Sequence, residues 1–175
     1  ADAFVKPPAL RKGDCVGLVA PSSPFQRDAC EAGIRFLEDE GFHVKHRPGL
    51  PERRKGFLAG EDWDRADEIQ GMFEDPGVNA IFVVRGGYGA QRILDRLDPD
   101  LIREHPKIFL GYSDVTCLLT FLLQRAQLVC FHGPVVNEMG TLSDVTRDCL
   151  LRLLTKGEPL GPIPAEHIRW IRTGL

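Results

Sequence analysis

The sequence predicts an α/β fold built on a parallel β-sheet. Five short segments with the pattern of strands are distributed along the 175 residues, and most of them are apolar runs typical of buried strands. Segments with helical spacing of apolar residues separate them, and this alternation is typical of βαβ units. The predicted strands cover residues 16–20, 42–46, 80–84, 107–111 and 128–131.

The first two predicted strands are separated by a clear helical segment. The strand at 16–20 ends at a proline, which cannot continue a sheet ladder. Residues 25–40 carry small or apolar side chains at helical spacing, and Gly41 supplies a C-cap. The strand at 42–46 leads into residues 47–60, a polar connection long enough to be functional.

The remaining elements continue the alternation. The predicted helix at 63–73 places Trp63, Ala66, Ile69 and Phe73 on one face. The other predicted helices cover residues 90–97, 116–125 and 142–154, and a proline at position 99 opens a further helical turn.

The end of the sequence has the composition of a linker. Residues 157–164 are rich in glycine and proline, and a last strand is expected over residues 168–171. We therefore assign residues 1–156 to one domain and residues 157–175 to a linker that leads toward a further domain.

The composition excludes several classes of protein. Hydrophobic residues make up 43% and charged residues 27%, which are ordinary values for a soluble globular chain and exclude a disordered one. Because no apolar run approaches the ~18 residues that span a bilayer, we expect no membrane segment. The net charge is −3 and no basic stripe is visible, which argues against a nucleic-acid partner.

The cysteines and the N-terminus favour a cytoplasmic protein. The five cysteines are widely spaced and form no C-x-x-C motif, so we interpret them as small buried side chains in a reducing compartment. The first ten residues lack the basic and apolar regions of a signal peptide.

The segment Arg85–Gly89 follows a predicted strand and precedes a helix. Glycines at such a turn present bare N–H groups that can bind an anion or a developing oxyanion. Two alternatives stay open: a dinucleotide-binding fingerprint, whose G-x-G-x-x-G spacing is not matched, and a tight turn that binds nothing.

A second strand-to-helix turn carries Ser113. The geometry of a nucleophile elbow would expose its hydroxyl at the edge of the sheet, beside the helix N-terminus. The motif is incomplete because Val115 stands where the elbow has glycine. The alternative is that Ser113 or Asp114 caps the helix.

Two further polar residues follow predicted strands. His132 is a candidate general base, although a structural histidine bonded to adjacent loops is the favoured interpretation. Ser22 is a candidate anion contact, although helix capping is favoured for it. His43 and His46 lack partners at metal-ligand spacing, so no metal site is expected.

Taken together, these motifs resemble the LD-carboxypeptidases, which are serine peptidases that remove the terminal D-alanine from murein tetrapeptides in the cytoplasm. The microcin immunity peptidases are a sister group with the same fold, and the glycine-rich segment is more similar to that of the murein enzymes. The motifs, in order, are Lys6-Pro7-Pro8, Gly13-Asp14, Val19–Ser23, Arg85–Gly89, Gly111–Asp114 and Phe131–Pro134.

The resemblance implies a flavodoxin-like sheet with helices on both faces, followed by a C-terminal domain. It implies that Ser113 is the nucleophile and that the N–H of Asp114, with that of Gly86 or Gly87, forms the oxyanion hole. An acyl-enzyme would form and be resolved by water, without a cofactor. The candidates for contact with the murein tetrapeptide are Arg85, Tyr88, Ser22 and His132.

The family takes its catalytic Glu and His from the C-terminal domain, which this sequence lacks. We therefore prefer that source of the base over His132, and we expect the isolated chain to be inactive. The resemblance also implies a homodimer. If 175 residues are the whole product, a nucleotide- or flavin-binding module and a non-catalytic interaction domain are the alternatives.

Overall fold

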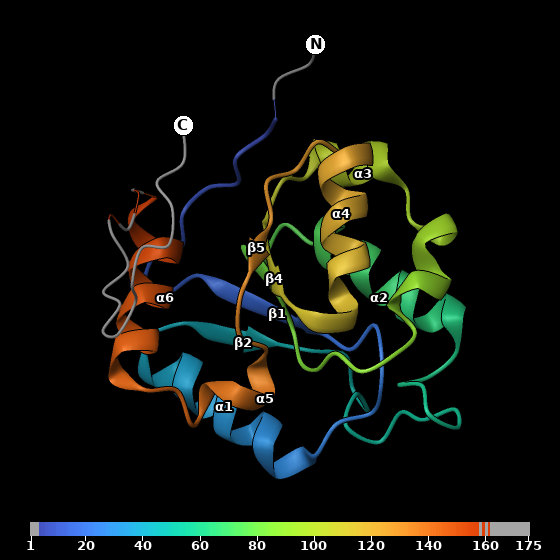
Figure 1. The fold of residues 1–175 in the computed structure, drawn as a ribbon, viewed down its shortest axis with the longest axis horizontal. Helices are drawn as coiled ribbons and strands as arrows, with labels where there is room; N and C mark the ends of the chain where they lie inside the picture. The colour runs from blue at the N-terminus through green and yellow to red at the C-terminus, as the bar shows by residue number, and fades with distance from the viewer. Residues whose placement is uncertain (1–3, 158, 160, 162–175) are drawn as a thin grey trace, which may run out of the picture.

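The computed structural model describes residues 4–157, 159 and 161 and shows a sheet between two layers of helices (Figure 1). All five strands of the sheet are parallel, in the order β2-β1-β3-β4-β5. This is the flavodoxin-like order of doubly wound folds, so the predicted fold class is confirmed. The strands are β1 (Cys15–Val19), β2 (His43–Lys45), β3 (Ala80–Val83), β4 (Ile108–Gly111) and β5 (Phe131–His132).

Helices cover both faces of this sheet (Figure 1). One face carries α1 (Arg27–Asp39), α5 (Val136–Met139) and α6 (Asp144–Lys156). The other face carries α2 (Asp62–Glu74), the 3₁₀ helix η1 (Ala90–Arg96), α3 (Pro99–Glu104) and α4 (Thr116–Arg125). A short 3₁₀ turn, η2 (Ser113–Val115), joins β4 to α4.

The central strands are apolar throughout because both of their faces are covered. In β3, Ile81 and Val83 belong to the core beneath α2 and α4, whereas Ala80 and Phe82 belong to the core beneath α1 and α6. All four are at most 1% exposed. Strands buried on both sides read as continuous apolar runs, which is why the sequence located them well.

Helix α5 was not predicted, because four residues are too few for a helical pattern. It packs closely on α1, where Gly33 makes the approach possible. A Cβ at Gly33 would lie 2.0 Å from the carbonyl oxygen of Val136. This contact holds the segment after β5 against the sheet.

Some boundaries differ from the prediction. Only Phe131 and His132 pair with β4, whereas Leu128 lies opposite Val5 in a parallel bridge. Val5 donates its N–H to the carbonyl of Gln127 and accepts the N–H of Val129. Tertiary pairing thus shifted the last strand. The helix predicted at 90–97 is a 3₁₀ helix. The strand expected over 168–171 and most of the linker lie outside the described residues.

The predicted buried face of α2 was wrong at one position. Trp63 is 58% exposed, whereas Arg65 and Glu68 on the same helix are fully buried. Hydrophobic spacing could not reveal this, because both charged side chains are buried to serve hydrogen bonds to neighbouring loops.

The five cysteines carry free thiols, and each is buried or partly exposed. Burial raises the pKa of Cys30 to about 11 and that of Cys130 to about 12. These two thiols therefore stay protonated at neutral pH and behave as small core side chains. In the part of the chain that the structure describes, no helix is long and apolar enough to cross a membrane.

Candidate active site

Most of the residues predicted for the site gather at the carboxyl ends of β1, β3 and β4, where parallel sheets bind ligands, whereas His132 lies on β5. Ser113 has a φ of +66°, in the left-handed region that residues other than glycine rarely adopt. The strain indicates that the surrounding structure holds this turn in place. The predicted strand-to-helix turn at Ser113 is therefore present in the structure, between β4 and α4.

The glycine-rich segment Arg85–Gly89 lies directly beside Ser113. A Cβ added to Gly86 would lie 3.5 Å from the Ser113 Oγ, so the bare backbone of Gly86 faces the hydroxyl at close range. Gly87 has a φ of +111°, which suits glycine. Within the described residues, the Ser113 hydroxyl makes no hydrogen bond, so it is free to meet a ligand.

The loop that follows β1 supports the glycine segment. Ser23 donates its N–H to the carbonyl of Gly86 at 3.2 Å, and its Oγ accepts the N–H of Tyr88 at 3.1 Å. A Cβ on Gly87 would lie 2.4 Å from the Ser23 Oγ. Ser23 thus fixes the backbone whose N–H groups are the oxyanion candidates, a role that local sequence patterns do not predict.

Asp114 joins three loops through one carboxylate. Its Oδ2 accepts the hydroxyl of Ser22 at 2.7 Å and the N–H of Ala90 at 2.9 Å. It therefore bonds to the first N–H of η1 and does not cap its own helix, so the capping interpretation of Ser113 and Asp114 was wrong. The carboxylate holds the turns after β1, β3 and β4 together.

Ser22 is fully buried, and its hydroxyl is used by Asp114. Helix α1 begins at Arg27 after Gln26, so the favoured capping role of Ser22 was also wrong. Its place in the structure is internal to the loops, whereas a substrate contact needs an accessible group.

We predict that Asp114→Ala lowers the free energy of unfolding by about 2 kcal/mol, because the Ser22 hydroxyl and the Ala90 N–H both lose their acceptor. Ser22→Ala should cost about 1 kcal/mol, since it removes one bond and leaves no donor unpaired. In the double variant the serine change should add almost nothing. Urea denaturation of the four proteins tests this, and additive losses would show that the two groups act separately.

Side chains of helix α2 also bond to the loops that surround Ser113. The buried Glu68 accepts the N–H of Ala20 at 2.8 Å and pairs with Arg53 at 2.9 Å. Burial raises the pKa of Glu68, and the Arg53 charge opposes that rise. Arg53 lies in the long loop after β2, where it donates to the carbonyl of Ala59 at 2.6 Å. It also donates to the carbonyl of Ala20 at 3.4 Å, which ties this loop to the segment after β1.

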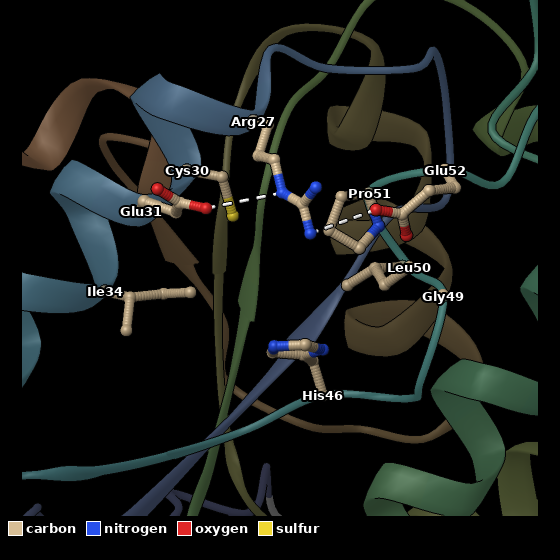
Figure 2. Close-up of a pocket in the computed structure, with 9 residues that line it drawn as sticks. All are labelled: Arg27, Cys30, Glu31, Ile34, His46, Gly49, Leu50, Pro51 and Glu52. Carbon is tan, nitrogen blue, oxygen red and sulfur yellow. Dashed lines mark ion pairs between the residues drawn. The ribbon is translucent and has the colours of Figure 1, made fainter.

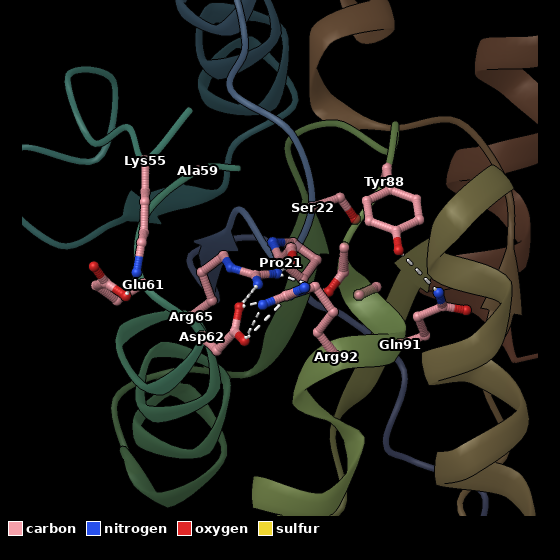
Figure 3. Close-up of polar contacts among 12 residues, drawn as sticks. Pro21, Ser22, Lys55, Ala59, Glu61, Asp62, Arg65, Tyr88, Gln91 and Arg92 are labelled. Atoms are coloured by element: carbon pink, nitrogen blue, oxygen red, sulfur yellow. Dashed lines mark hydrogen bonds and ion pairs between the residues drawn. The ribbon is translucent and has the colours of Figure 1, made fainter. Parts of the chain in front are cut away.

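Arg65 is buried beside this pair and links two of the loops. Its Nη1 donates to the carbonyl oxygens of Pro21 and, at 2.9 Å, of Gly89. Figure 3 shows Asp62 between the guanidinium groups of Arg65 and Arg92, which it contacts at 2.5 and 2.9 Å. The hydrogen bond from Arg92 lowers the pKa of Asp62. In the sequence, the bonds from α2 to these loops could have been suspected only from the charged residues Arg65 and Glu68 among the apolar positions of the helix.

The other predicted contacts lie on the rim. Arg85 donates to the carbonyl of Pro24 at 2.6 Å, and Tyr88 is 46% exposed. His132 is exposed on β5, with its ring 6.0 Å from that of Tyr112 in an edge contact. In the described ranges His132 makes no hydrogen bond, so the ring is bonded neither to adjacent loops nor to Ser113.

A separate cavity lies on the β2 side of the sheet (Figure 2). Its volume is about 160 Å³, and it contains none of the predicted site residues. Arg27 crosses it and pairs with Glu31 at 3.3 Å and Glu52 at 3.1 Å. Because both carboxylates already satisfy this guanidinium, the cavity does not present a free cation. Throughout the described ranges, acidic, histidine and cysteine side chains do not gather in a group that could hold a metal.

Comparison with known families decides the identity. Residues 16–133 match the family model described as the LD-carboxypeptidase N-terminal domain. The chain belongs to the LD-carboxypeptidase family. The region that matches this LD-carboxypeptidase model contains both turns of the site, at Arg85–Gly89 and at Ser113.

Relatives of this LD-carboxypeptidase domain belong to two groups. The probable murein peptide carboxypeptidase of Bacillus subtilis is 44% identical over 80% of this chain and 44% of the relative. The microcin C7 self-immunity protein MccF of Escherichia coli is 30% identical over 84% of this chain and 44% of the relative. The chain thus spans about half the length of the curated relatives it matches.

A solved structure of an MccF-like protein from Bacillus anthracis has the same fold. It superimposes with a TM-score of 0.81 at 32% identity, covering 86% of this chain and 47% of that chain. The relatives of this LD-carboxypeptidase domain thus include both a probable murein peptide carboxypeptidase and an immunity protein.

Proposed function

We propose that this chain carries the nucleophile and the oxyanion hole of a serine LD-carboxypeptidase that removes the terminal D-alanine from murein tetrapeptides during peptidoglycan recycling in the cytoplasm. The observation that carries the proposal is the strained Ser113 turn, whose free hydroxyl faces the bare backbone of Gly86. The greater identity to the murein peptide relative than to MccF supports a murein substrate.

In the proposed reaction, the Ser113 Oγ attacks the carbonyl carbon that precedes the terminal D-alanine. The oxyanion accepts hydrogen bonds from the N–H of Asp114 and from that of Gly86 or Gly87. The C–N bond then breaks, the leaving nitrogen takes the serine proton by way of a base, and an ester remains on Ser113. Water hydrolyses the ester, which releases the shortened peptide and restores the hydroxyl.

The base is the part of the mechanism that the described residues do not supply. A serine hydroxyl needs a base within hydrogen-bond reach, and the Ser113 hydroxyl has none among residues 4–157, 159 and 161. We propose that a Glu and a His from the C-terminal domain of the full-length protein complete the site, and that the full-length protein is a homodimer.

The experiment that tests this function combines substrate release with labelling of the nucleophile. The full-length protein should release D-alanine from a murein tetrapeptide, and a serine-directed fluorophosphonate should modify Ser113. Saturable binding of a nucleotide or flavin, without D-alanine release and without labelling, would instead support the binding-module alternative.

We predict that residues 1–175 expressed alone release D-alanine at least about 10³-fold more slowly than the full-length protein, because a general base contributes about 10²–10⁴-fold. Adding the remaining half in trans should recover part of the activity. If the fragment matched the full-length rate, the base would have to lie in this chain, and His132 would become the leading candidate.

A further inference from the structure

Two large aromatic side chains lie in contact on the surface beside the candidate active site. Phe57 is 63% exposed and Tyr88 is 46% exposed. Their ring centroids are 5.6 Å apart, with an angle of 59° between the planes. Exposed aromatic rings that meet at the rim of a site are typical of a surface used for recognition.

The backbone that carries Phe57 is firmly anchored. Lys55 and Leu58 form a pair of backbone hydrogen bonds of 2.9 and 3.0 Å, which place Phe57 in the two-residue turn between them. Leu58 is buried, and Ala59 donates its N–H to the carbonyl of Ser22 at 2.9 Å. The backbone of the turn is therefore tied to the loops of the site.

Tyr88 is fixed to the same loops. Its N–H is bonded to Ser23, and its hydroxyl accepts a hydrogen bond from the Gln91 amide at 3.4 Å (Figure 3). Tyr88 lies two residues from Gly86, a separation of at most ~7 Å along the chain. Because a Cβ added to Gly86 would lie 3.5 Å from the Ser113 Oγ, the aromatic pair is within reach of a peptide whose scissile bond lies at Ser113.

The geometry points to a group with a ring as the occupant. Since Phe57 and Tyr88 touch each other, they leave no slot between them, and each offers one outer face for stacking. The Tyr88 hydroxyl and the Gln91 amide add hydrogen-bonding groups at the rim. A sugar ring fits this combination, because it presents a C–H face to an aromatic ring and hydroxyls to the polar groups.

We propose that Phe57 and Tyr88 form a subsite of the candidate active site that binds the amino sugar of a murein peptide. This inference rests on the proposed function, since the peptide must lie at Ser113. It implies that the preferred substrate is a peptide still attached to its sugar, and that the free tetrapeptide forfeits the aromatic contact.

The test measures binding in the full-length protein with Ser113→Ala, so that turnover cannot interfere. By calorimetry, Phe57→Ala should weaken binding of a muramoyl tetrapeptide about tenfold, or about 1.4 kcal/mol. Binding of the free tetrapeptide should be unchanged, and Phe57→Tyr should restore the affinity for the muramoyl peptide. The matched control is Phe4→Ala: Phe4 is 61% exposed, and its neighbour Val5 pairs with Leu128 ahead of β5, at the opposite edge of the sheet.

Three results for Phe57→Ala would overturn the proposal. Binding of the muramoyl and free tetrapeptides could be weakened equally, or binding of neither could be weakened. The third result is weakened binding only of an aminoacyl nucleoside, which serves as a ligand with a ring that is not part of murein. A failure of the proposed function is a separate result. It would appear as an absence of D-alanine release by the protein with Ser113 intact, whatever the binding data show.

Discussion

Replacing Ser113 by alanine should reduce D-alanine release by the full-length protein about 10⁴- to 10⁶-fold, as expected when the nucleophile of a catalytic group is removed. The rate should fall without a change in KM, because no other group can form the acyl-enzyme. The free energy of unfolding should change by less than ~1 kcal/mol, since the hydroxyl makes no hydrogen bond that contributes to folding.

Ser113→Gly separates catalysis from backbone strain. This variant should be as inactive as the alanine variant, yet more stable by about 1 kcal/mol, because glycine adopts the φ of +66° without a steric cost. Activity assays and thermal unfolding of the two variants provide the comparison. Retained D-alanine release in either variant would remove Ser113 from the mechanism.

The largest loss of stability is expected at Arg53. Arg53→Ala should lower the free energy of unfolding by about 3–5 kcal/mol at pH 7, because it leaves the Glu68 carboxylate buried without its cation. Arg54→Ala is the matched control. Arg54 is exposed, so its loss should change stability by less than ~0.5 kcal/mol.

The loss at Arg53 should depend on pH. Without Arg53, burial raises the folded-state pKa of Glu68 above its unfolded value, so the folded protein binds the extra proton. Stability is then highest below the unfolded pKa and falls as pH rises through the folded pKa. The deficit should therefore be smaller at pH 5 than at pH 7.

Glu68→Gln in the Arg53→Ala protein checks this explanation. The amide can still accept the Ala20 N–H but has no charge, so the pH dependence should disappear. Urea denaturation at the two pH values measures both effects. A deficit that is the same at pH 5 and pH 7 in Arg53→Ala would mean that lost packing, and not the buried carboxylate, causes the instability.

Local patterns in the sequence were sufficient for the central strands and for the positions of the two turns of the site. The strands β1, β3 and β4 are covered on both faces, so each appears as an apolar run, whereas tertiary pairing displaced the last strand from its predicted position. Glycines after one strand, and a serine between another strand and a helix, marked the two turns, but that pattern alone did not separate a nucleophile from a helix cap.

Tertiary structure decided which side chains support these turns. Asp114 bonds to Ser22 and Ala90, which are 92 and 24 positions away along the chain. Glu68 accepts the N–H of Ala20, which is 48 positions away. No local period encodes such contacts, and the buried charge of Glu68 contradicts the apolar pattern of its helix. The aromatic pair likewise exists only because folding brings the turn at Phe57 against Tyr88. Sequence patterns report what neighbouring residues do together, whereas the loops of this site are held by groups that meet only when the strand ends are placed side by side.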